Sequence, residues 1–180
     1  MAHPSRKAYI PYLEEKLGPV PISWDEKNSI WDTARRAWLL FDPFADYHVV
    51  VQDDTIIGKN FVETCQLIMT KDMVYNFYIG RPKFVAMIER RKALGKDHLI
   101  KKNICHEICL GFPTKRVKEM VAYVDSLNPD SDRYINKYVT SRGLRVWFPL
   151  PSRVDHRNEG TLHNLNRGHY VAKATWFVGE

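Results

Sequence analysis

Apolar side chains recur along this chain at two different spacings. Residues 28–41 are apolar at positions 30, 31, 34, 37, 38 and 41, which is the spacing that buries one face of a helix. Residues 47–51 are apolar apart from His48, and a short run of this kind is typical of a buried strand. The two spacings alternate, so the pattern predicts helices placed between strands.

The same reading predicts the remaining elements. A helix over 8–18 would carry Pro11 in its first turn, where a missing N–H is harmless. Thr114 is expected to cap a helix whose Val117, Met120, Val121 and Val124 face inward. Further helices are predicted over 58–69, 81–94 and 131–142, and strands over 20–24, 73–79, 103–110 and 144–148. Strands alternating with helices predict one α/β domain over 1–180, with a mostly parallel sheet flanked by helices.

Two adjacent acids, Asp53 and Asp54, follow the strand predicted over 47–51. Ligands in parallel α/β sheets bind beyond the carboxyl ends of the strands, and paired carboxylates suit a hard divalent cation held together with phosphate oxygens. A turn that ends the strand and exposes two solvated acids is equally compatible with this sequence. The spacing alone leaves both interpretations open.

Charge and cysteine content narrow the class of protein. The chain has 180 residues, a net charge of +6 and 44% hydrophobic residues, which suits a folded domain with an anionic partner. It shows no signal peptide and no run near the roughly 18 apolar residues of a membrane span. Three cysteines without framework spacing predict reduced thiols and a cytoplasmic protein. Cys105, His106 and Cys109 would be weak zinc ligands, because no fourth ligand stands at the usual spacing.

Several other residues are candidates for a binding site. Arg6 could contact a phosphate, Asp25 ends a predicted strand and could accept from a ribose or cap a helix, and Arg35 or Arg36 could point toward the site. Ordinary roles are open for each of them. Three more candidates lie late in the chain: Asp130 and Asp132 at a helix start, where the dipole favours acids, and His156 in a polar segment where it could ligate a metal.

Five stretches together resemble the small family-2-like glycosyltransferases of bacteria and phages, which have the GT-A nucleotide-sugar-binding fold. They are HPSR (3–6), WDTARRAW (31–38), HVVVQDD (48–54), LGFPT (110–114) and PLPSRVDHR (149–157). The resemblance covers most of the chain in the same order.

This resemblance implies a metal-dependent transfer of sugar from a nucleotide-sugar donor, most simply a UDP-sugar, to a hydroxyl group. The Gln52-Asp53-Asp54 motif would hold Mn²⁺ or Mg²⁺, with Asp54 as the ligand. His156 would complete the metal shell. Arg6, Asp25 and Arg35 would line the nucleotide site. In inverting members an acid at a late helix start takes the acceptor's proton, and Asp132 matches it best, with Asp130 in reserve.

The chain departs from the family pattern in three places. Gln52 stands where an acid is usual, and the late segment reads Ser131-Asp132 instead of two acids. Only two residues precede His3, so the first strand of the fold is expected to be short or missing.

The acceptor is not encoded in a readable motif. A hydroxymethylated DNA base, as in phage DNA modification, and a saccharide both suit a small basic enzyme. A non-catalytic nucleotide- or nucleic-acid-binding module on a degenerate GT-A sheet is the alternative. DNA binding would be steeply salt-dependent, because phosphate contacts release counterions.

Overall fold

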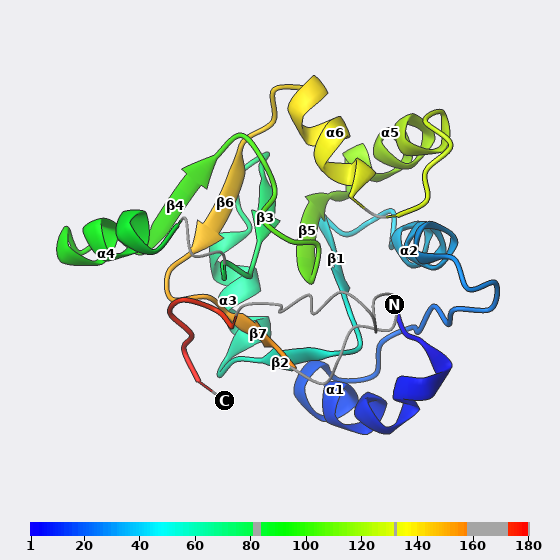
Figure 1. The fold of residues 1–180 in the computed structure, drawn as a ribbon, viewed down its shortest axis with the longest axis horizontal. Helices are drawn as coiled ribbons and strands as arrows, with labels where there is room; N and C mark the ends of the chain where they lie inside the picture. The colour runs from blue at the N-terminus through cyan, green and yellow to red at the C-terminus, as the bar shows by residue number, and fades with distance from the viewer. Residues whose placement is uncertain (81–83, 132, 158–172, 180) are drawn as a thin grey trace, which may run out of the picture.

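The computed structural model describes residues 1–80, 84–131, 133–157 and 173–179 and shows one mixed α/β domain (Figure 1). Its helices are η1 (Pro4–Tyr9, a 3₁₀ helix), α1 (Ile10–Leu17), α2 (Ile30–Leu39), α3 (Phe61–Ile68), α4 (Val85–Ala93), α5 (Thr114–Asp125) and α6 (Tyr134–Ser141). Its strands are β1 (Tyr47–Val51), β2 (Thr55–Ile57), β3 (Val74–Asn76), β4 (His98–Lys101), β5 (Cys109–Pro113), β6 (Val146–Pro149) and β7 (Val154–His156).

Five strands form the main sheet in the order β1-β5-β3-β6-β4. Only β3 and β6 are parallel, and the β1–β5, β3–β5 and β4–β6 pairs are antiparallel. The expected α/β class is therefore confirmed, whereas the mostly parallel sheet is corrected to a mixed one. The strands β2 and β7 form a separate antiparallel pair.

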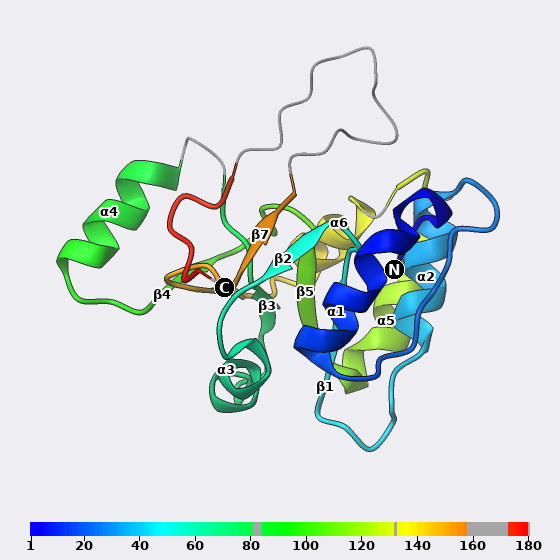
Figure 2. The same ribbon diagram turned by 90° about the horizontal axis from the view of Figure 1, so that it is seen from below.

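Successive side chains of a strand point to opposite faces of a sheet. Residues of β1, β3, β5 and β6 therefore pack alternately into two hydrophobic cores, one on each face of the main sheet. In β5, Leu110 and Phe112 pack with the residues of α2, α5 and α6, whose ribbons gather on one side of the sheet in Figure 1. Cys109 packs in the second core, which draws on α1, α3 and the β2–β7 pair. The views in Figures 1 and 2 both place α4 beyond β4, far from the N-terminus.

The helices follow the sequence pattern most closely. The helix expected over 28–41 is confirmed as α2, which Ser29 caps by accepting from the Asp32 N–H. In α1, Pro11 lies in the first turn as expected. The expected Thr114 cap is wrong: Pro113 occupies the cap position, α5 begins at Thr114, and the Thr114 hydroxyl has no hydrogen-bond partner among the described residues.

The strands were predicted less well. The expected strand over 103–110 is wrong, because this part of the main sheet is formed by β4 before it and by β5, which overlaps only its end. The expected strand over 20–24 is reduced to a parallel bridge between Ala2 and Trp24. Within the described ranges no strand pairs with β1 on the side opposite β5.

None of the helices in the described part of the chain has the length and apolar character needed to cross a membrane.

Candidate active site

A tight turn places the two acids directly beyond the carboxyl end of β1. The Gln52 N–H donates to the Ile108 carbonyl over 2.9 Å and continues the β1–β5 ladder by one more rung. The Thr55 N–H then donates back to the Gln52 carbonyl over 3.2 Å, which closes the turn around Asp53 and Asp54. Both acids are buried, so neither is a solvated turn residue.

The second, small sheet brings His156 to Asp54. Thr55 in β2 lies opposite His156 in β7, and the residue before Thr55 is Asp54. The His156 Nε2 atom lies 3.1 Å from Asp54 Oδ2. The Arg157 N–H donates to the Asp54 carbonyl over 2.9 Å and fixes the same junction through the backbone. Two residues far apart in the sequence therefore meet because β2 and β7 pair.

The N-terminal segment contacts both acids. The His3 N–H donates to Asp53 Oδ2 over 2.7 Å, and Arg6 Nη1 donates to Asp53 Oδ1 over 3.0 Å. The same Arg6 nitrogen also donates to Asp54 Oδ2. Both oxygens of Asp53 thus have partners from the N-terminal segment, which gives this residue the geometry of an anchor for that segment.

Asp54 and His156 each keep one buried polar atom without a partner. No described group donates to Asp54 Oδ1, and His156 Nδ1 likewise has no hydrogen-bond partner in the described residues. Such atoms are costly to bury and are rare in folded proteins, so they point to a ligand that is bound during function. Burial tends to raise the pKa of Asp54, but the His156 hydrogen bond and Arg6 outweigh it and hold that pKa below its ordinary value.

Arg157 is a member of this site that the sequence analysis did not single out. Its guanidinium carbon lies 4.9 Å from the ring centre of Tyr9 and 4.6 Å from that of Tyr12. Its Nε is buried without a hydrogen-bond partner in the described part of the chain. The only feature of the sequence that could have identified Arg157 is its place in the PLPSRVDHR stretch, directly after His156.

Three expected nucleotide contacts lie outside this cluster. The Asp25 carboxylate accepts from the N–H groups of Lys27 and Ser29 and so organises the approach to α2. Arg35 forms an ion pair of 2.9 Å with Asp125 of α5, which joins the two helices. Its neighbour Arg36 pairs with Asp32 and Glu26 and donates to the Trp24 carbonyl. Structural roles therefore account for these contacts of Asp25 and of both arginines.

The two candidates for the catalytic base follow α5. Asp130 is exposed in the segment between α5 and α6. Asp132 lies outside the described residues. No contact among the described residues brings Asp130 to the Asp54–His156 pair.

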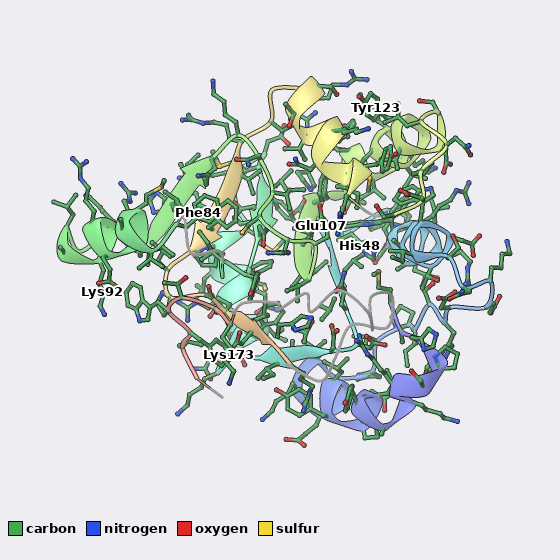
Figure 3. All side chains as sticks on the ribbon, in the orientation of Figure 1. His48, Phe84, Lys92, Glu107, Tyr123 and Lys173 are labelled. Atoms are coloured by element: carbon green, nitrogen blue, oxygen red, sulfur yellow. The ribbon has the colours of Figure 1, made fainter. Side chains whose placement is uncertain are left out.

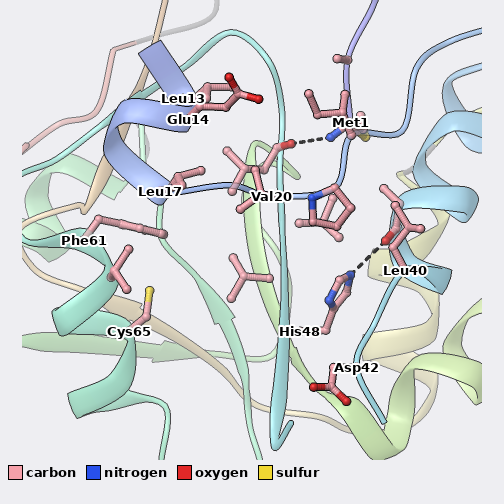
Figure 4. Close-up of a pocket in the computed structure, with 18 of the residues that line it drawn as sticks. Met1, Leu13, Glu14, Leu17, Val20, Leu40, Asp42, His48, Phe61 and Cys65 are labelled. Atoms are coloured by element: carbon pink, nitrogen blue, oxygen red, sulfur yellow. Dashed lines mark hydrogen bonds between the residues drawn. The ribbon is translucent and has the colours of Figure 1, made fainter. Parts of the chain in front are cut away.

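A cavity of about 400 Å³ runs along the open edge of β1, next to the acid turn (Figure 4). All five β1 residues line it, with Leu13 and Leu17 of α1 across from them. The Met1 amine donates to the Val51 carbonyl over 2.7 Å at one end. Burial lowers the pKa of this amine to about 6, against the attraction of Asp53. His48 extends from β1 toward α2 (Figures 3 and 4), where its Nε2 lies 3.0 Å from the Ala37 carbonyl.

The cysteines are free thiols. Cys105 and Cys109 are buried, and burial raises the pKa of Cys109 well above its usual range. Among the described residues there is no group of three or more His, Cys, Asp or Glu side chains that could hold a metal ion.

Comparison of the chain with protein-family models gave no match, and comparison with curated proteins found no similar sequence.

Proposed function

We propose that this protein is a metal-dependent glycosyltransferase that moves a sugar from a nucleotide-sugar donor to a hydroxyl acceptor. The observation that carries the proposal is the buried Asp54–His156 pair at a strand end. Each of the two side chains has one polar atom without a hydrogen-bond partner among the described residues. This is where α/β sheets bind ligands, and it is the pair that the resemblance to GT-A enzymes selects.

The donor set at the turn fits Mn²⁺ or Mg²⁺. These ions bind oxygen and imidazole ligands, and Mg²⁺ commonly uses one or two carboxylates together with substrate phosphates and water. Asp54 and His156 would hold the ion, and two protein ligands leave room for a diphosphate. When bound, such an ion stabilises negative charge that develops on a leaving diphosphate.

Nearby residues suit the rest of an anionic donor. The Arg6 guanidinium contacts Asp54, and arginine binds phosphate oxygens through paired hydrogen bonds. The Arg157 guanidinium lies over the Tyr9 ring, one residue along the chain from His156. The +6 net charge of the chain favours the approach of such a ligand. In an inverting reaction Asp132, or Asp130 in its place, would accept the acceptor's proton.

The acceptor in this proposal is a hydroxyl group on a DNA base or on a saccharide, in the cytoplasm of a bacterium or of a phage-infected host. A non-catalytic binding module is the second candidate. The observation that favours it is that Asp25 and Arg35, two expected donor contacts, already have structural partners.

A thermal-shift panel of nucleotide sugars, with and without Mn²⁺, tests the proposal. The enzyme should be stabilised only when metal and the right donor are both present, by roughly 2.7 kcal/mol at 100 times the dissociation constant. Binding that ignores the metal would favour the module instead. The absence of any shift across UDP-, GDP-, dTDP- and CMP-sugars would argue against a donor site.

A further inference from the structure

Arg6 occupies the acid turn in a way that no ordinary anchoring role requires. One of its nitrogens, Nη1, donates to a carboxylate oxygen of both Asp53 and Asp54. The hydrogen bond from the His3 N–H to the Asp53 carboxylate already ties the N-terminal segment to the turn. The second contact, to Asp54, brings the positive charge of Arg6 onto the residue that would hold a metal.

A guanidinium and a divalent cation cannot share this position. Asp54 Oδ2 already meets both Arg6 Nη1 and His156 Nε2, so a cation bound between Asp54 and His156 would lie against the guanidinium. Two like charges about 4 Å apart repel strongly where water is excluded, and the side chain of Asp54 is only 6% exposed. A divalent cation that binds at this oxygen would therefore have to displace the Arg6 guanidinium from Asp54 Oδ2.

We infer that Arg6 is an internal counter-cation that a divalent metal must displace from Asp54, and that the displaced guanidinium then binds the diphosphate of the donor. The inference rests on the proposed function, because it takes the Asp54–His156 pair as the metal site. It assigns Arg6 as the positioning residue that makes metal and diphosphate bind as a pair.

In this proposal the Arg6 side chain moves only from Asp54 to a diphosphate bound beside it. Arg6 lies inside η1 with non-helical φ and ψ of −107° and 17°, and the His3 N–H bond to Asp53 holds the start of this segment. The guanidinium would therefore stay beside the metal after it leaves Asp54. A metal alone would remove the Asp54 contact of Arg6 and leave the one with Asp53, whereas a metal with a diphosphate also supplies new oxygen partners. The metal should bind weakly alone and tightly with a nucleoside diphosphate.

The experiment measures Mn²⁺ binding without any nucleotide, from the electron paramagnetic resonance signal of the free ion. Arg6→Gln removes the competing charge and should lower the Kd for Mn²⁺ by about tenfold or more relative to the unsubstituted chain. Arg6→Lys keeps a positive charge and should stay within about threefold of the unsubstituted value. Lys7→Gln, one exposed residue further along η1, is the matched control and should change nothing.

Addition of UDP supplies the second half of the test. The unsubstituted chain should gain Mn²⁺ affinity when UDP is present, and Arg6→Gln should gain much less because its diphosphate partner is missing. Equal Mn²⁺ affinities for the unsubstituted chain and Arg6→Gln would overturn the inference, and so would an absence of Mn²⁺ binding in both. A tenfold gain in Arg6→Gln would support it even if no nucleotide sugar bound, so the two proposals can fail separately.

A second measurement covers the case in which Arg6→Gln does not fold. Side-chain NMR of the arginine-labelled, unsubstituted protein reports the Arg6 guanidinium directly, and Mg²⁺ serves as a diamagnetic metal. The Arg6 signal should move as Mg²⁺ is added, because its contact with Asp54 is lost while the one with Asp53 remains. A signal that stays unchanged through saturation, or a titration without any binding, would overturn the inference.

Discussion

Among the aspartate–arginine clusters of the described residues, those at Asp72 and Asp54 differ mainly in their access to water. Asp72 accepts from Arg116 over 2.9 and 3.1 Å and pairs with Lys115, and its side chain is 42% exposed. Asp54 meets Arg6 and His156 with a side chain only 6% exposed. Similar chemical groups thus stand in two very different environments.

The exposed cluster is complete without a ligand. Hydrogen bonds from Arg116 and Lys115 lower the pKa of Asp72 to about 2, and water can reach its remaining lone pairs. Surface pairs of this kind contribute little to stability. The buried cluster keeps unpartnered atoms on Asp54 and His156, so its composition is explained better by binding than by folding. Burial, and not the presence of an acid beside an arginine, separates a site from a surface ion pair.

The largest expected difference between the two clusters is in stability. Arg6→Gln leaves two buried carboxylates without their cation and should lower the free energy of unfolding by roughly 3–5 kcal/mol in the presence of a chelator. Arg116→Gln should lower it by less than about 1 kcal/mol, since Asp72 is solvated. Urea unfolding of both variants measures the two values, and Mn²⁺ should restore part of the loss in Arg6→Gln only. Similar losses in both variants would remove the distinction between the clusters.

The next effect concerns ligand binding. Asp54→Ala removes the proposed metal ligand and should weaken Mn²⁺-dependent donor binding by at least about 100-fold, beyond the usual effect of losing a residue that only supports a ligand. Asp72→Ala removes an acid of the exposed cluster and should leave donor binding unchanged. Isothermal titration with the donor found in the panel makes the comparison. Unchanged metal dependence in Asp54→Ala would show that Asp54 is not a ligand.

The smallest expected effect is a dependence of stability on pH. Burial lowers the pKa of the Met1 amine, next to the buried cluster, to about 6 from its ordinary value of 8.0. The unfolded chain therefore binds more protons than the folded chain between these values, and stability should fall as the pH drops from 8 to 6, by up to about 2 kcal/mol. Asp72 stays ionised throughout this range and contributes nothing to the slope.

Acetylation of the Met1 amine is the control for this pH effect. The acetylated chain cannot take up the proton, so its stability should be flatter over the same range. Burial also lowers the pKa of His48, and His48→Gln removes that second contribution of the same sign. Equal slopes for the acetylated and free chains in the His48→Gln background would show that the amine is not responsible.

The sequence by itself determined the elements whose signals are local. The 3.6-residue spacing of apolar side chains identified α2 and the inward face of α5, because a helix is held by bonds within its own segment. The run before Asp53 identified β1, and the position of the acids at its carboxyl end followed at once. The α/β class also followed from the alternation of these patterns, whereas the mostly parallel strand direction inferred from it was wrong.

Only the tertiary structure decided how the strands pair and which residues meet at the acid turn. Strand order and direction depend on partners far along the chain. Local sequence patterns therefore did not predict the antiparallel β1–β5 pair, nor that the strand expected over 103–110 would instead form at Cys109–Pro113. His156 reaches Asp54 because β7 pairs with β2, and Arg6 reaches it because His3 is tied to Asp53. The unpartnered atoms of the site are a property of burial, which arises only when separate segments pack together and exclude water.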